Sequence, residues 1–113
     1  MNKHEIFAKV KAHLLRQGTR SMSENDDGCA YRGQGGLSCA VGCLIPDDAY
    51  SSMIENHPAD YYLVQQCLPF EVTPEIERLL RALQGVHDDT MPTYWEMVLS
   101  DVARNFNIEE PTS

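Results

Sequence analysis

The sequence predicts an α+β fold: a mainly helical single domain of four to five helices with one small antiparallel β-hairpin near residues 29–44. Three observations support this. Apolar residues recur at helical spacing near the N-terminus and twice in the C-terminal half. Glycines and β-forming residues are concentrated in one central stretch. A chain of 113 residues, 42% of them hydrophobic, suits one hydrophobic core and no second domain.

The first predicted element is an amphipathic helix over residues 3–17. Val10 and Leu14 belong to its apolar face, and lysines and arginines occupy the other face. Gly18 follows directly, as expected for a residue that ends a helix. Residues 19–28 are polar and predict a loop.

The hairpin prediction rests on two short β-prone runs, residues 29–32 and 37–44. A three-residue Gln-Gly-Gly loop at 34–36 pairs Tyr31 with Cys39, and it offers two glycines for the left-handed position such loops need. Directly opposed residues share a face of the ribbon, so this register places three cysteines on one face. That face carries Cys29, Tyr31, Leu37, Cys39, Val41 and Cys43.

Four more segments have helical features. A short helix is expected from Pro46 to about Glu55, and a second from Ala59 to Cys67. The two strongest apolar stripes follow a Thr-Pro pair and a single proline, and they predict helices over 74–87 and 92–107. The end of the chain, residues 109–113, is expected to be a flexible tail.

The charge balance limits the classes of partner. The chain carries 17 acidic and 9 basic residues, a net charge of −8, which disfavours direct nucleic-acid binding and suits solubility or a basic protein partner. No apolar run approaches the roughly 18 residues that a membrane span needs, and no signal peptide is recognisable at the N-terminus. A cytoplasmic location with reduced thiols is therefore expected.

The segment CAYRGQGGLSCAVGCLIPDDAY, residues 29–50, resembles a motif of small uncharacterised proteins from tailed bacteriophages and proteobacteria. The similarity extends to the first helix and to LLRALQGVHDD, residues 79–89, so it covers most of the chain. The resemblance implies a small accessory protein, encoded by a phage or prophage and working in a bacterial cytoplasm. It implies no activity, cofactor or catalytic residue.

The candidate zinc ligands are Cys29, Cys39 and Cys43. Three thiolates on one face would supply three of the four ligands that a structural zinc site needs. Their C-x9-C-x3-C spacing differs from the C-x2-C pair usual in such sites. Cysteine is also a small hydrophobe that is often buried, so packing in the core is the favoured interpretation. The candidates for a fourth ligand are Cys67, His57 and His87.

His87 and Asp88 form the other candidate for chemistry, since a histidine beside a carboxylate suits a general base or a metal ligand. The alternative is a histidine that caps the C-terminus of a helix. No nucleophile accompanies the pair, so the sequence favours a protein that is not an enzyme. A calcium loop beginning at Ser23 is rejected, because its twelfth position is Gln34 where a bidentate glutamate is needed.

The leading hypothesis is a protein that acts by binding another protein, here a host bacterial protein that it modulates or inhibits. The alternatives are a small zinc-binding domain built on the hairpin cysteines and a hydrolase-like enzyme around His87 and Asp88. Aromatic side chains are enriched at protein interfaces, and exposed carboxylates suit a basic partner. The interface candidates are Tyr61, Tyr62, Asp47, Asp48, Asp88 and Asp89.

Overall fold

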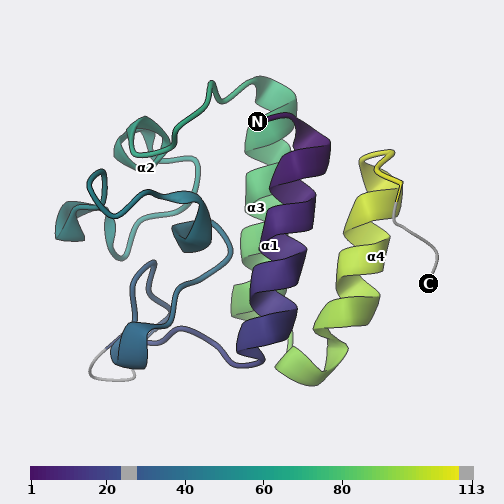
Figure 1. Ribbon diagram of the computed structural model, residues 1–113, viewed down its shortest axis with the longest axis horizontal. Helices are drawn as coiled ribbons and strands as arrows, with labels where there is room; N and C mark the ends of the chain where they lie inside the picture. The colour runs from purple at the N-terminus through teal and green to yellow at the C-terminus, as the bar shows by residue number, and fades with distance from the viewer. Residues whose placement is uncertain (24–27, 110–113) are drawn as a thin grey trace.

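Three long helices form one side of the molecule in the computed structural model, which describes residues 1–23 and 28–109. They are α1 (Lys3–Gln17), α3 (Pro74–Asp89) and α4 (Trp95–Asn105). Helices α1 and α3 run in the same direction, and α4 returns antiparallel to both (Figure 1). The chain between α1 and α3 forms the other side of the molecule and contains the short helix α2 (Tyr62–Gln66).

Helix α1 begins and ends where the sequence predicts. The Asn2 side chain accepts a hydrogen bond from the Glu5 amide, and the Glu5 side chain accepts one from the Asn2 amide, which together form a capping box. At the other end Gly18 adopts the left-handed conformation, with φ 68°, and its amide donates to the Leu14 carbonyl. The apolar face of α1 is buried against the other helices.

Helix α3 starts at the predicted Thr-Pro pair and continues to Asp89, two residues past the predicted end. The Thr73 side chain accepts the Ile76 amide, so one of the free donors at the helix N-terminus is satisfied. The expected helix over 92–107 is divided into a 3-10 turn, Pro92–Tyr94, and helix α4. The first residue of α4, Trp95, is fully buried at the centre of the core.

The expected α+β fold is wrong, because the described residues form no β-sheet and no β-hairpin. Two isolated antiparallel bridges, Met22 with Cys29 and Arg32 with Ser38, are the only β pairing in the part of the chain that the structure describes. The Gly33 amide donates to the Leu37 carbonyl across a 3-10 turn, but the ladder does not continue beyond the Arg32–Ser38 bridge. The protein is mainly helical.

The hairpin fails because side chains take the backbone groups that a ladder would use. The Glu55 carboxylate accepts the amides of Tyr31 and Arg32, at 2.9 and 3.1 Å. The Val41 amide donates to the Gln84 side chain on α3, at 3.0 Å. Val41 itself has helical dihedrals and leads into a 3-10 turn, Gly42–Leu44, so the second expected strand curls against α1.

The two short helices expected in the central segment are smaller than predicted. Between Pro46 and Glu55 the chain forms turns and the 3-10 turn Ser52–Ile54, and the helix expected over 59–67 is reduced to α2. Glu109 is exposed, and the rest of the expected tail, residues 110–113, lies outside the described residues. Among the described helices, none is long and apolar enough to cross a membrane.

Replacing Gly42 with alanine should destabilise the fold. A β-carbon at this position would overlap the Tyr31 carbonyl oxygen and lie 3.0 Å from the carbonyl carbon, so the backbone would have to separate. We expect Gly42→Ala to lower the free energy of unfolding by about 2–3 kcal/mol. Urea denaturation followed by the fluorescence of Trp95 measures this.

Gly85→Ala is the matched control. A β-carbon there would lie 3.8 Å from Asp89 Oδ2, an ordinary contact, and alanine favours the interior of helix α3. We expect this variant to gain roughly 0.5–1 kcal/mol. A Gly42→Ala protein as stable as the unmodified chain would contradict the close approach of Gly42 and Tyr31.

Candidate functional site

The C-terminal end of α3 is joined to the segment after α1 by the side chain of His87, which is fully buried. Its Nδ1 lies 2.7 Å from Asp88 Oδ1, and its Nε2 accepts the Ser21 amide at 2.9 Å. A backbone amide can only donate and an ionised carboxylate can only accept, so the proton of this imidazole is on Nδ1. The ring stacks on Trp95, with centroids 5.7 Å apart.

Arg20 reinforces the same junction. Its guanidinium donates to the carbonyls of His87 and Thr90, at 3.1 and 2.9 Å, and the Trp95 indole also donates to the Thr90 carbonyl. Carbonyls at the end of a helix have no partner within the helix and favour a nearby cation. The chain after α1 is therefore fixed to the end of α3 by both a side chain and a backbone amide.

Asp88 is held in its ionised form at this junction. Burial alone would raise its pKa, but hydrogen bonds from His87 and Gln84 outweigh that effect and hold the pKa below its ordinary value. The thiol of Cys29 lies against the same carboxylate. Burial and the charge and hydrogen bonding of Asp88 raise the pKa of this thiol to about 11.

A cavity of about 370 Å³ opens beside Cys29 and Asp88. Its opposite wall is formed by the turn at Asn56, His57 and Pro58, which follows the buried end of the 3-10 turn Ser52–Ile54. The Tyr31 hydroxyl donates to the His57 carbonyl at 2.7 Å and holds the two walls at a fixed separation. The remaining lining residues are Gly28, Ala30, Tyr31 and Gln84.

Among the described residues, the only group of three or more possible metal ligands is Cys29, His87 and Asp88, whose ligand atoms lie within 4.8 Å of one another. The hydrogen bonds of His87 oppose a metal there. A metal on Nδ1 would displace its proton while Nε2 still faces the Ser21 amide, which would require an imidazolate anion. Cys29 and Asp88 are left as the two groups able to ligate.

The other cysteines do not join that group. The Cys39 sulfur is buried and accepts the Gly42 amide, and the Cys43 thiol donates to the Ala40 carbonyl at 3.1 Å. The Cys67 thiol donates to the Leu63 carbonyl. The structure therefore brings Cys29 next to a carboxylate and an imidazole, and it places the other thiols in separate local hydrogen bonds.

The groups around His87 are poorly arranged for hydrolysis. Burial is the main cause that raises the pKa of Cys39 to about 12 and that of Cys43 to about 11, so these thiols, like Cys29, are protonated at neutral pH. The Nε2 lone pair of His87 accepts a hydrogen bond from the Ser21 amide, so it is not available to a substrate or to water. In the structure this pair, one of the sequence candidates for a general base, joins the end of α3 to the chain after α1.

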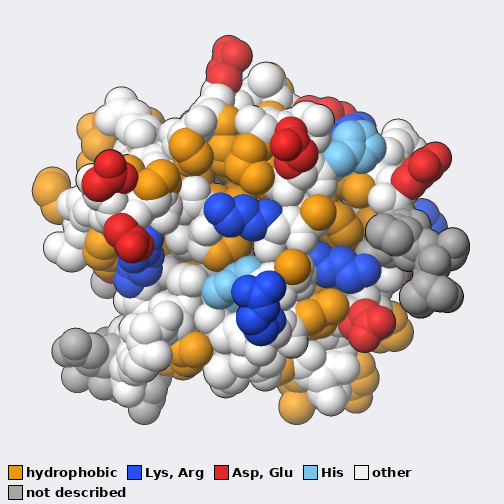
Figure 2. Space-filling view, in the orientation of Figure 1, with side chains coloured by type: hydrophobic (Ala, Val, Ile, Leu, Met, Phe, Trp, Pro, Cys, Tyr) orange, Lys and Arg blue, Asp and Glu red, His pale blue; other side chains and the backbone are white. Residues whose placement is uncertain are grey.

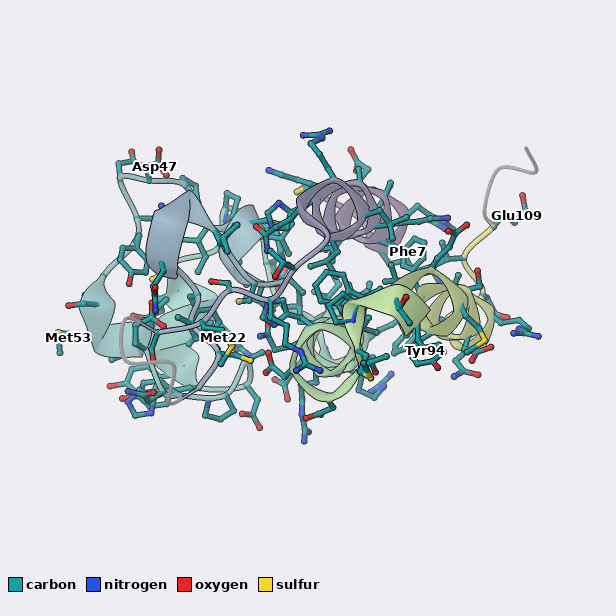
Figure 3. The ribbon with its side chains drawn as sticks, turned by 90° about the horizontal axis from the view of Figure 1, so that it is seen from below. Phe7, Met22, Asp47, Met53, Tyr94 and Glu109 are labelled. Carbon is teal, nitrogen blue, oxygen red and sulfur yellow. The ribbon has the colours of Figure 1, made fainter. Side chains whose placement is uncertain are left out.

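The interface candidates lie in three places. Tyr61 stacks on His57 with centroids 4.2 Å apart, and the exposed Tyr62 touches Tyr61 edge to face. Asp47 projects from the loop at the far edge of the central segment and pairs with Arg32 at 2.8 Å (Figure 3). Asp48 is exposed beside Asp47 in the same loop. The third place is the end of α3, where Asp88 and the exposed Asp89 lie.

Sequence reasoning missed Gln84, which lines the cavity, and also Ser21 and Glu55, which form hydrogen bonds with the lining residues Ala30 and Tyr31. Gln84 had a local signal, because a glutamine four residues before an aspartate on a helix commonly pairs with it, as Gln84 does with Asp88. Glu55 and Ser21 had none for these contacts, since their hydrogen bonds with His87, Ala30, Tyr31 and Arg32 span 9 to 66 residues.

No known protein family, curated protein or solved structure matches this chain. The resemblance to phage and proteobacterial proteins remains a prediction.

Alkylation measured cysteine by cysteine should show that the thiols react slowly in the native protein. A pKa near 11 leaves Cys29 and Cys43 with about 100-fold less thiolate at neutral pH than a cysteine of pKa 9.0. We expect iodoacetamide at pH 8 to modify them about 100-fold more slowly than in the urea-unfolded chain, with Cys39 slowest. Mass spectrometry of each peptide measures the rates, and a native Cys29 as fast as the unfolded one would contradict its contact with Asp88.

Asp88→Asn should reduce stability in a pH-dependent way. The folded pKa of Asp88 lies below its ordinary value of 3.8, so the ionised side chain stabilises the fold above about that pH. This contribution is lost as the pH falls through the folded pKa. The difference in unfolding free energy between the unmodified protein and Asp88→Asn should therefore be largest at neutral pH and shrink below about pH 4.

Urea unfolding between pH 7 and pH 2 measures that difference. Asp89→Asn removes the same charge from the exposed neighbouring residue and serves as the control. A difference for Asp88→Asn that stays constant over the whole range would refute the role of the ionised carboxylate.

Proposed function

We propose that this protein is a small accessory protein that acts by binding another protein, and that the contact is made by a groove on α1. The groove has a volume of about 300 Å³ and carries the proposal, because its lining is mainly apolar and lies open on the surface. It runs along α1 and is closed at one side by the residues after α4. It is lined by His4, Phe7, Ala8, Lys11, Ala12, Leu15, Ile108 and Glu109.

The shape of this groove suits a helix of the partner. Ala8 and Ala12 are small and one turn apart, so a second helix can approach α1 closely. Leu15 is 41% exposed at one end, where it offers an apolar contact. Phe7 lies between α1 and α4 and forms the floor (Figure 3). Apolar anchors of this kind provide most of the affinity at protein interfaces.

The charges on α1 indicate the chemistry of the partner. The helix carries four basic residues and one acidic residue, a net charge of +3, whereas the chain carries −8, so the remainder carries −11. Basic side chains gather over α1 in the middle of one face, and most acidic ones lie toward its edge (Figure 2). An amphipathic segment with an apolar ridge and acidic flanks complements this surface.

The resemblance stated above supplies the biological setting of the proposal: a phage-type protein in the bacterial cytoplasm whose partner is a host protein that it modulates or inhibits. The sequence-based expectation of a basic partner rested on the net charge of the whole chain, −8, and the proposal departs from it for the groove on α1. The zinc-binding and hydrolase alternatives have less support, since Cys29, Cys39 and Cys43 are not grouped and the lone pair of His87 is occupied.

The experiment is a pull-down from bacterial lysate with the unmodified protein, Leu15→Glu and Met53→Glu. Both positions are exposed apolar residues, but Met53 lies far from α1 at the opposite edge of the molecule (Figure 3). We expect a partner to be retained by the unmodified protein and by Met53→Glu and lost with Leu15→Glu. A loss of at least tenfold is expected when a charged side chain replaces an apolar contact of the interface.

Lys11→Glu tests the charge complementarity separately. It should weaken capture and make the remaining binding less sensitive to salt, because it reverses one charge at the rim of the groove. Repeated pull-downs that return no partner, or a partner bound equally by Leu15→Glu, would refute the proposal.

A further inference from the structure

The cavity beside Cys29 shares no lining residue with the groove on α1, so it needs a separate explanation. We propose that this cavity is a binding site for a small organic cation, an alkylguanidinium or alkylammonium group, with the Asp88 carboxylate as its counter-ion. The proposal is based on the Asp88 carboxylate, which lines the cavity and is held in one orientation by hydrogen bonds. This inference is independent of the proposed protein partner.

The Asp88 carboxylate is held in one orientation before any ligand binds. His87 and Gln84 fix its Oδ1 with hydrogen bonds of 2.7 and 3.0 Å, so the carboxylate does not have to reorganise when a ligand arrives. About one third of the side chain stays accessible. A partly buried carboxylate in a site of reduced dielectric attracts a cation more strongly than an exposed one does.

The charges around the cavity favour the same ligand. Asp88 and Asp89 act on the Cys29 thiol, and Glu55 and Asp60 add their negative charge at Tyr31 on the adjoining wall. Arg20 is the cation that acts on the Cys29 thiol, and its guanidinium donates hydrogen bonds to the carbonyls of His87 and Thr90. The C-terminus of α3 contributes a further partial negative charge.

The walls limit the size and shape of the ligand. A cavity of about 370 Å³ is near the lower limit for small-molecule sites, so it suits a cationic head with a short alkyl chain. Ala30, Pro58 and the Tyr31 side chain offer apolar surface for the chain, while Asn56 and Gln84 offer amide groups. Among the described residues that line the cavity there is no lysine or arginine to compete for Asp88.

The test is a titration of the full-length protein with butylguanidinium and with butylurea, its neutral isostere, followed by amide chemical shifts in NMR spectra. We expect butylguanidinium to bind with a Kd of roughly 1 mM and to shift the amides of Gly28, Ala30 and Tyr31. Butylurea should bind at least tenfold more weakly, because it has the shape of the ligand without its charge.

Substitutions in and near the cavity distinguish binding at this site from a general electrostatic attraction to the acidic protein. Asp88→Asn should weaken butylguanidinium binding at least tenfold, whereas Asp89→Asn, which removes an equal charge outside the lining, should change it less than threefold. Because Asp88→Asn also affects stability, His57→Lys provides a second variant: it places a competing ammonium on the exposed opposite wall and should weaken binding without touching Asp88.

Three results would overturn the proposal. They are the absence of butylguanidinium binding up to several tens of millimolar, equal binding of butylguanidinium and butylurea, and an unchanged affinity in both Asp88→Asn and His57→Lys. Binding of N-acetylarginine methylamide with the same shifted amides would indicate that an arginine side chain can also supply the cation.

Discussion

The buried imidazole of His87 is the contact on which the arrangement of this protein depends. It ties the chain that follows α1 to the end of α3 through the Ser21 amide, and it orients Asp88. A buried donor left without an acceptor costs about 1–3 kcal/mol, so the buried Ser21 amide depends on the His87 ring for its partner. The bridge from Met22 to Cys29 and one wall of the cavity begin directly beside this contact.

Polar side chains on regular elements replace a β-sheet in the rest of the central segment. Gln17 on α1 both donates to and accepts from the backbone of Ser38, and Gln84 on α3 accepts the Val41 amide. Glu55 does the same for two consecutive amides and also accepts the Tyr50 hydroxyl. Among the described residues, no buried side-chain nitrogen or oxygen lacks a hydrogen-bond partner, as is usual for a folded protein.

The parts that could be predicted from sequence are those whose causes are local. The capping box of α1, Gly18, and the Thr-Pro start of α3 each lie within four residues of the contacts they make, and these helices were predicted to within two residues. The prediction of a hairpin was wrong because β-propensity reflects the type of each residue and does not identify the group with which its backbone will pair. Whether Tyr31 pairs with Cys39 or with the distant Glu55 is decided by tertiary contacts that no local pattern reports.

The candidate site shows the same division. His87 and Asp88 were recognisable as a pair, but the role of His87 depends on Ser21, 66 residues away, whose amide donates to the His87 Nε2. Cys29 was recognisable as a candidate metal ligand beside Cys39 and Cys43, yet its neighbours are Asp88 and His87 and not another thiol. Two surface hollows remain as candidates for function: a mainly apolar groove on α1, and a cavity at the end of α3 that is lined by the Asp88 carboxylate.

The most direct measurement of this account is the tautomer of His87 together with the exchange of the Ser21 amide. Long-range ¹H–¹⁵N NMR spectra of the native protein at neutral pH should show a protonated Nδ1 and an unprotonated Nε2, and the Ser21 amide should exchange slowly with solvent. An Nε2-protonated ring, or a Ser21 amide that exchanges as fast as an open loop, would contradict the contact that joins α3 to the central segment.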